Sequence, residues 1–223
     1  MSALAQRFAL VHARIARACE QAGRDSAQVK LLAVSKFQPL SALREAYALG
    51  QREFGENYAQ ELADKASALS DLAGLRFRFI GALQRNKAKL LAPLACAVET
   101  LASESSARAL HERLPEGAPA LEVMVQVNTS GEAQKSGVDP AELGALLAAL
   151  HALPRLSVSG LMTIPKASDP AAARLSYRRL RELAEAHALT ELSMGMSDDL
   201  ELAIAEGATR VRVGTALFGP RPS

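Results

Sequence analysis

The sequence predicts an α/β fold, a single (β/α)8 barrel of the TIM type with an extra helix at its N-terminus. Three observations favour this fold. Short apolar runs alternate with helical segments over nearly the whole chain, as in proteins with a parallel sheet and right-handed crossovers. Eight such runs can be counted, which is the number of strands that closes a barrel of this kind. The 223 residues also suit one barrel better than two separate domains.

Each expected strand is a short apolar run that stops near a polar residue or a glycine. The runs are Leu31–Ser35, Glu53–Phe54, Phe77–Ile80, Ala95–Glu99, Leu121–Asn128, Leu156–Gly160, Leu192–Ser193 and Thr209–Val213. An open, doubly wound sheet would show the same alternation. The count of eight strand–helix units favours the closed barrel over the open sheet.

The segments between the expected strands carry Leu and Ala at helical spacing. They are Leu40–Leu49, Tyr58–Leu69, Gln84–Leu91, Ser105–Leu114, Pro140–Leu150, Ala171–Ala188 and Asp198–Ala205. An amphipathic helix precedes them, because Leu4, Phe8, Val11 and Ile15 recur on one face. No linker or repeat divides the chain, so we expect one domain over residues 1–223, with the N-terminal helix at about 2–22 and the barrel at about 29–219.

The composition argues against several classes of function. A formal net charge of +2, without a basic arm or patch, does not indicate a nucleic-acid-binding protein. No apolar run approaches the roughly 20 residues that span a bilayer, and the first residues do not resemble a signal peptide. Cys19 and Cys96 have no metal-binding or redox spacing, so no metal site is predicted. We therefore expect a cytoplasmic protein that binds neither nucleic acid nor membrane.

Lys36 closes the first expected strand and is the residue that most strongly indicates a function. The carboxyl ends of parallel strands are where α/β proteins bind their ligands. An amine placed there can form a Schiff base with an aldehyde if its surroundings keep part of it neutral. A solvated lysine at a strand end is the common alternative, because lysines are seldom buried.

Two other strand ends suit a phosphate group. The segment Met194–Ser197 leads a glycine-containing turn into a predicted helix, where free backbone N–H groups attract anions. Gly214 and Thr215 follow the last strand and offer an open backbone and a hydroxyl. Ser197 could instead act only as the N-cap of the helix that we expect from Asp198. No glycine motif for nucleotide phosphates is found in the sequence.

Arg212 lies in the last expected strand, between Val211 and Val213. If the two valines face the helices, strand alternation points Arg212 into the barrel. A buried guanidinium needs a partner, which is either a carboxylate or an acceptor atom of a ligand. An arginine keeps its protons, so a pyridine nitrogen that meets one would stay largely unprotonated.

Together these segments resemble the pyridoxal 5'-phosphate (PLP) homeostasis proteins of the YggS/PROSC type, relatives of the alanine racemase barrel. The resemblance runs from about Leu31 to Arg221. Its motifs are L-L-A-V-S-K, F-G-E-N-Y-A-Q-E, F-R-F-I-G-A-L-Q-R-N-K, Q-V-N-T-S-G-E-A-Q-K-S-G, G-L-M-T-I-P, L-S-M-G-M-S-D-D and V-R-V-G-T-A-L-F-G-P-R. Phe37-Gln38 departs from the Thr-Lys pair of many relatives. Arg78 replaces the usual histidine, which removes one acid/base candidate near the rim without touching the expected anchors.

The resemblance implies that Lys36 holds the aldehyde of PLP as an internal aldimine. The cofactor-binding residues that it implies are Lys36, Asn57, Met162, Ser197, Arg212, Gly214 and Thr215. Ser197, Gly214 and Thr215 would hold the phosphate. Arg212 would meet the pyridine nitrogen, and Asn57 and Met162 would line the ring. Lys87 and Lys135 lie in family motifs without an assigned role.

Two functions remain open. The resemblance implies a PLP-binding carrier or regulator in vitamin B6 homeostasis, without catalytic residues of its own. PLP-dependent apoenzymes would be its recipients, and the protein would be a monomer or a weak dimer. The alternative is an amino-acid racemase of the alanine racemase type, which needs a second base opposite Lys36. Tyr47, Tyr58 and Tyr177 fall in or beside expected outer helices, so we favour the carrier.

Overall fold

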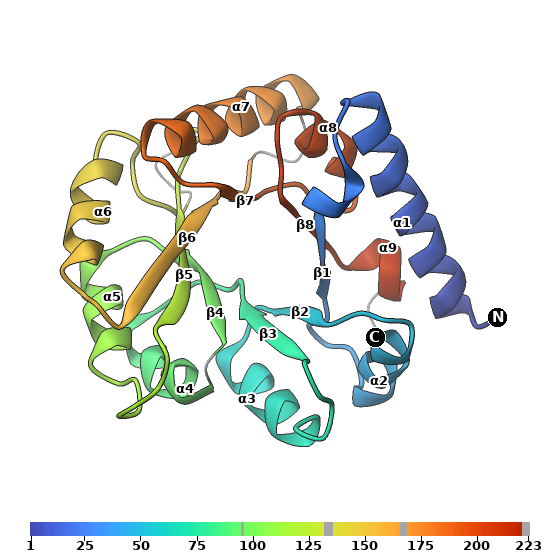
Figure 1. Ribbon diagram of the computed structural model, residues 1–223. Helices are drawn as coiled ribbons and strands as arrows, with labels where there is room; N and C mark the ends of the chain where they lie inside the picture. Colours follow the sequence, from blue (N-terminus) through green and yellow to red (C-terminus); the bar gives the residue numbers. More distant parts are fainter. Residues whose placement is uncertain (95, 132–135, 166–168, 220–223) are drawn as a thin grey trace.

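The computed structural model describes the chain except for residues 95, 132–135, 166–168 and 220–223. Its centre is a closed barrel of parallel strands in the order β1 to β8, with β8 paired back to β1 (Figure 1). The strands are β1 Lys30–Val34, β2 Glu53–Glu56, β3 Arg76–Phe79, β4 Ala97–Leu101, β5 Leu121–Gln126, β6 Leu156–Met162, β7 Glu191–Ser193 and β8 Arg210–Val213. The predicted barrel is therefore confirmed, and the open sheet is excluded.

Helices surround the barrel, and α1 lies outside it beside α8 and α9 (Figure 1). The longer helices are α1 Ala3–Gln21, α2 Leu40–Ala48, α3 Ala59–Ala68, α5 Glu104–His111, α6 Leu143–His151 and α7 Pro170–Ala186. The shorter ones are α4 Ala88–Leu91, α8 Leu200–Ala205, α9 Thr215–Phe218 and the 3-10 segments η1 Ser26–Gln28, η2 Arg85–Lys87 and η3 Ala92–Leu94. Among the helices that the structure describes, none has the length and apolar character needed to cross a membrane.

Many of the predicted boundaries differ from the observed ones by a few residues, and two of these differences matter for the site and the barrel. Helix α8 begins at Leu200 with Asp199 at its N-cap position, so the prediction of a helix from Asp198 capped by Ser197 is wrong. The Met196 N–H donates to the Asp199 carboxylate at 2.6 Å, which holds this segment as a turn. Strand β4 begins at Ala97, and Ala95, its expected start, lies outside the described residues. The sequence does not predict α9, because its four residues are too few to show a helical period.

The two faces of each strand have different roles. Alternate residues such as Ala33, Phe54 and Val123 face the helices and belong to the main hydrophobic core. Val211 and Val213 also lie in that core, so Arg212 points into the barrel as predicted. The barrel interior therefore combines apolar side chains such as Leu32 and Met124 with buried charged ones.

Arg78 occupies the barrel interior and pairs with glutamates from two neighbouring strands. Its guanidinium binds the buried carboxylate of Glu99 and the carboxylate of Glu122. Burial lowers the pKa of Arg78, but these carboxylates outweigh that effect and raise the pKa above its ordinary value. Because it lies within this interior network, the residue that replaces the family histidine serves the barrel core rather than the rim.

Arg210 occupies the same interior from β8. Its side chain is only 2% exposed, and its guanidinium lies 3.3 Å from the carboxylates of Glu53 and Glu191 and 3.6 Å from that of Glu99. Several carboxylates thus share the two cations, Arg78 and Arg210. Such an arrangement compensates charges that water cannot reach.

Replacing Arg210 with methionine should destabilise the protein strongly, because it leaves Glu53, Glu99 and Glu191 with too few cations. We expect the free energy of unfolding in urea to fall by about 3–5 kcal/mol. The control is Arg108→Met, which removes an exposed ion pair with Glu104 within α5. This variant should change the free energy of unfolding by about 0.5 kcal/mol or less. Equal losses of unfolding free energy in both variants would show that the interior network stabilises the protein no more than an exposed ion pair does.

Candidate functional site

The predicted site residues gather at the carboxyl ends of five strands that are neighbours in the barrel. Lys36 stands two residues after the end of β1, and Asn57 directly follows β2. Met162 is the last residue of β6, and Ser197 lies in the turn between β7 and α8. Arg212 is the penultimate residue of β8, with Gly214 and Thr215 directly behind it. The structure therefore brings all of the predicted residues to one rim.

The ends of β1 and β8 are in direct contact. Ala33 pairs with Val213 in the ladder that closes the barrel. A Cβ on Gly214 would lie 3.3 Å from the Val34 carbonyl oxygen, closer than nine in ten real Cβ contacts. Glycine at this position thus lets the turn after β8 approach the segment that leads into Lys36.

The backbone on both sides of Lys36 is fixed by hydrogen bonds. The Ser35 hydroxyl donates to the Glu56 carboxylate at 2.6 Å, and the Phe37 N–H donates to the Glu61 carboxylate at 2.6 Å. Phe37 adopts a positive φ of 63°, a conformation that costs a non-glycine residue about 1 kcal/mol. Strain at a fixed turn beside a candidate amine is typical of a functional site.

Lys65 of α3 connects these contacts. Its buried ammonium donates to the Ser35 carbonyl at 2.6 Å, to Glu56 at 2.8 Å and to Glu61 at 2.7 Å. Three acceptors match the three N–H groups of a lysine. Burial raises the pKa of Glu56, and the bonds from Lys65 and Ser35 limit that rise. Lys65 therefore holds the Lys36 turn against β2 and α3.

Among the described residues, Arg212 has no direct ion pair with a carboxylate, which is one of the two kinds of partner that the sequence suggests. Its guanidinium donates to the Ser193 hydroxyl at 2.9 Å and to the Thr163 carbonyl at 2.8 Å. The Ser193 hydroxyl in turn donates to the buried Glu99 carboxylate at 2.6 Å. Burial lowers the pKa of Arg212, and the Glu99 charge opposes this shift. A carboxylate thus acts on Arg212 through a serine rather than by direct pairing.

Asn57 lies at the rim with an unsatisfied polar atom. Its Oδ1 is buried and has no hydrogen-bond partner among the described residues. Its backbone carbonyl lies so close to Gly81 that a Cβ on Gly81 would come within 1.8 Å of the oxygen. The glycine after β3 therefore makes room for Asn57. A buried amide oxygen without a partner in the protein can accept a hydrogen bond from a ligand or from water.

Met162 is fully buried at the end of β6. It pairs with Ser193 of β7 and with Gln126 of β5 in the sheet. The next residue, Thr163, accepts a hydrogen bond from Arg212 through its backbone carbonyl. Met162 therefore lies next to the residue that binds the Arg212 guanidinium. An apolar side chain in this place can contact a flat ring.

The three predicted phosphate residues also come together. The Ser197 hydroxyl accepts a hydrogen bond from the Ala216 N–H at 3.5 Å, so the turn after β7 touches the start of α9. In the part of the chain that the structure describes, the backbone N–H groups of Ser197, Gly214 and Thr215 have no acceptor. Free N–H groups beside two hydroxyls suit an anion with several oxygens. We call Ser197, Gly214, Thr215 and Ala216 the anion cup.

The acidic residues next to the anion cup do not oppose an anion as strongly as their sequence position suggests. The Asp199 carboxylate accepts hydrogen bonds from the Met196 N–H and from the Tyr177 hydroxyl, both at 2.6 Å. Asp198 is exposed to solvent, which screens its charge. Burial raises the pKa of Tyr177, and the bond to Asp199 adds to this shift.

Comparison with known proteins identifies the family. Residues 10–222 match the family model of the alanine racemase N-terminal domain. A Pseudomonas aeruginosa protein named pyridoxal phosphate homeostasis protein is 50% identical, over 99% of this chain and 97% of its own length. An Escherichia coli protein of the same name is 42% identical, over 99% and 98% of the two chains. This chain belongs to the pyridoxal phosphate homeostasis family.

Solved structures agree with this family. PipY of Synechococcus elongatus, solved with PLP bound, has a TM-score of 0.82 and 37% identity, and covers 97% of this chain and 100% of its own. A Corynebacterium glutamicum alanine racemase has a TM-score of 0.64 and 23% identity, over 96% of this chain and 61% of its own. At that identity the likeness to the racemase shows the fold alone.

The two lysines of the family motifs that have no assigned role are not among the rim residues described above. Lys87 is exposed on the surface after β3, and Lys135 lies outside the described residues.

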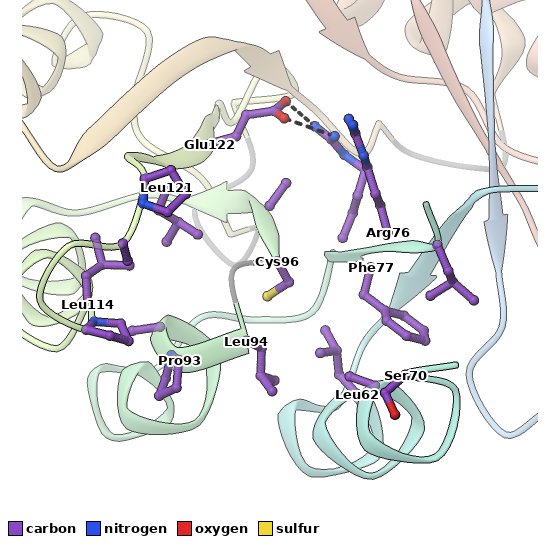
Figure 2. A pocket seen from close by; sticks show the side chains of 18 of the residues that line it. Leu62, Ser70, Arg76, Phe77, Pro93, Leu94, Cys96, Leu114, Leu121 and Glu122 are labelled. Atoms are coloured by element: carbon purple, nitrogen blue, oxygen red, sulfur yellow. Dashed lines mark hydrogen bonds and ion pairs between the residues drawn. The ribbon is translucent and has the colours of Figure 1, made fainter. Parts of the chain in front are cut away.

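A cavity of about 500 Å³ opens between α3 and the amino ends of β3 and β4 (Figure 2). Its lining includes Leu62, Cys96 and Leu121, at the end of the strands opposite to Lys36. This cavity is therefore separate from the predicted family site.

Sequence reasoning missed the residues that support the site. Glu99 and Ser193 stand in short apolar runs, and Lys65 follows Glu61 at the spacing of an exposed helical ion pair. The signal that could have found Glu99 and Ser193 is a polar residue at an inward position of a barrel strand. Lys65 gave no such signal, because its burial depends on how α3 packs.

Replacing Gly81 with alanine should disrupt the rim, because the added methyl would overlap the Asn57 carbonyl. We expect the free energy of unfolding to fall by about 3 kcal/mol or more, measured in urea. Gly144→Ala in α6 is the matched control, because its methyl would lie 3.6 Å from the nearest atom, Cε1 of His187. We expect this variant to be more stable by about 0.5–1 kcal/mol. A harmless Gly81→Ala would contradict the close approach of the two segments.

Proposed function

We propose that this chain binds PLP covalently through the amine of Lys36 and takes part in intracellular PLP homeostasis as a carrier or regulator. The observation that carries this proposal is the contact between the ends of β1 and β8, which places the Lys36 turn beside the anion cup. PLP offers an aldehyde to the amine and a phosphate to the anion cup. The names of the P. aeruginosa and E. coli relatives and the PLP-bound PipY support the same cofactor.

The residues at the rim fit this cofactor. Ser197, Gly214 and Thr215 would hold the phosphate with free N–H groups and hydroxyls. The buried amide of Asn57 has an unpaired oxygen and would bind a polar group of the ring. Met162 would contact the ring, in agreement with its apolar character.

Arg212 would meet the pyridine nitrogen and weaken catalysis at the same time. PLP, when bound, supplies an aldehyde that captures amines and a ring that withdraws electrons. An arginine keeps its protons, so Arg212 would donate a hydrogen bond to the nitrogen without protonating it. A neutral ring withdraws electrons less strongly than a protonated one, which favours holding the cofactor over turning substrates over.

The tyrosines also favour a carrier over a racemase. The Tyr177 hydroxyl is bound to Asp199, and the Tyr47 hydroxyl donates to the Ala73 carbonyl on the outer surface. Tyr58 lies at the rim, half exposed, with its ring centroid 5.2 Å from that of Phe37. Tyr58 thus touches the Lys36 turn through Phe37, and it is the residue to test as a second base.

The remaining parts of the proposal follow from the same function. We propose that residues 1–223 act as one domain, in the cytoplasm, as a monomer or a weak dimer. PLP-dependent apoenzymes would receive the cofactor. The near-neutral net charge of +2 and the lack of a membrane-crossing helix among the described residues are consistent with this setting.

Borohydride reduction should attach PLP to Lys36. The purified protein, mixed with PLP and reduced, should gain the mass of one reduced adduct on the peptide that contains Lys36, because reduction makes the amine linkage permanent. Lys36→Ala should lose this adduct. Lys89→Ala, which removes an exposed lysine of α4, should keep it. A wild-type adduct on a different lysine would overturn the assignment.

The carrier and the racemase differ in turnover. With PLP and either enantiomer of several amino acids, we expect no chiral inversion at a kcat of about 1 per second or more, measured by chiral chromatography. Inversion at such rates would contradict the carrier. If Tyr58→Phe then abolished it, Tyr58 would be the second base of a racemase.

A further inference from the structure

Helix α1 lies against the two segments that form the anion cup. It runs beside α8, which follows the turn of Ser197, and beside α9, which follows Gly214 (Figure 1). Phe8 of α1 packs edge-to-face on Phe218 of α9, with ring centroids 6.3 Å apart. The N-terminal helix therefore covers the back of the site, not the bottom of the barrel.

Arg14 reaches from α1 to the first half of the anion cup. Its guanidinium donates to the Ser197 carbonyl at 2.9 Å and binds both carboxylate oxygens of Glu201 in α8, at 2.6 and 2.9 Å. The ion pair with Glu201 fixes the direction of the guanidinium, because a bidentate contact allows little rotation. The Ser197 carbonyl is thereby held toward α1.

This contact also orients the next backbone N–H. In a trans peptide the C=O and the following N–H point in opposite directions. Since the Ser197 carbonyl faces Arg14, the Asp198 N–H points away from α1. Within the described residues that N–H has no acceptor. Arg14 thus keeps the Asp198 N–H on the side of the turn that faces away from α1.

Arg7 reaches the second half of the anion cup. Its guanidinium donates to the Leu217 carbonyl at 2.5 Å and to the Phe218 carbonyl at 3.3 Å. These carbonyls stand at the C-terminal end of α9, where a helix has no internal donors left for them. Binding them fixes the position of α9, and with it the Gly214–Thr215 turn at its start.

We propose that Arg7 and Arg14 are positioning residues that hold the two halves of the anion cup at the spacing that the PLP phosphate requires. The two arginines are seven residues apart, about two turns of one helix, so they project from the same side. The inference rests on the proposed function only in naming phosphate as the occupant. A rigid helix that carries both contacts couples the turn after β7 to the turn after β8.

Arg17 provides a matched control on the same helix. It is exposed, and no hydrogen bond or ion pair is found for it among the described residues. The apolar face of α1, which includes Leu4, Val11 and Ile15, is untouched by changes at any of the three arginines. Loss of helix packing and loss of the two contacts can therefore be separated.

The experiment compares PLP with pyridoxal, which has the same ring and aldehyde but no phosphate. Dissociation constants for both are measured by absorbance titration of wild-type protein and of Arg7→Met, Arg14→Met and Arg17→Met. We expect Arg7→Met and Arg14→Met each to weaken PLP binding by about tenfold and to leave pyridoxal binding nearly unchanged, because only the phosphate contacts are displaced. Arg17→Met should match the wild type for both compounds.

Three results would overturn the proposal in distinguishable ways. Equal weakening of PLP and pyridoxal, with a lower melting temperature, would show that the arginines only stabilise the fold. Unchanged preference for PLP in both variants would show that the anion cup does not need α1. A wild-type protein that binds PLP no better than pyridoxal would contradict the anion cup itself, whatever the variants do. If Arg14→Met fails to fold, Arg14→Lys replaces it, because lysine cannot bind the carbonyl and the carboxylate in the same forked geometry.

Discussion

The buried carboxylate of Glu99 connects the barrel interior to the functional rim. One of its oxygens pairs with Arg78 and lies 3.6 Å from Arg210. The other accepts a hydrogen bond from Ser193, whose oxygen accepts from Arg212. A buried carboxylate needs all of these partners, because no water compensates its charge. The orientation of Arg212 at the rim is therefore a consequence of charge balance deeper in the barrel.

The other side of the rim depends on similar contacts made from outside the barrel. Lys65 binds three acceptors around the Lys36 turn, and Glu61 holds the strained Phe37 in place. Helix α1 holds the anion cup through Arg7 and Arg14. In each case a helix outside the sheet fixes a turn at the rim. Sites supported in this way lose little conformational freedom when a ligand binds.

The same barrel serves different chemistries, and the residues at its rim decide between them. The C. glutamicum alanine racemase shares the barrel at 23% identity, with this chain covering 61% of its length. Our proposal of a carrier rests on an amine, an anion cup and an arginine that cannot protonate a ring. None of these features is a property of the fold alone.

The sequence by itself determined the barrel and most of the rim. Eight apolar runs at regular spacing predicted the strands, and strand alternation correctly turned Arg212 inward. Lys36, Ser197 and Gly214 could be placed at one edge because parallel strands end on the same side. Local pattern is enough for such predictions, since they depend only on the period of a strand and the order of the elements.

Only the tertiary structure decided what holds these residues in place. Lys65 follows Glu61 as an ordinary surface pair would, yet packing of α3 buries it under the Lys36 turn. Arg14 reaches Ser197 across 183 positions of the chain. Glu99 is a charged residue in an apolar strand, and its partners come from β3, β7 and β8. These contacts join segments far apart in sequence, and a local pattern carries no information about which distant charges will share a buried space.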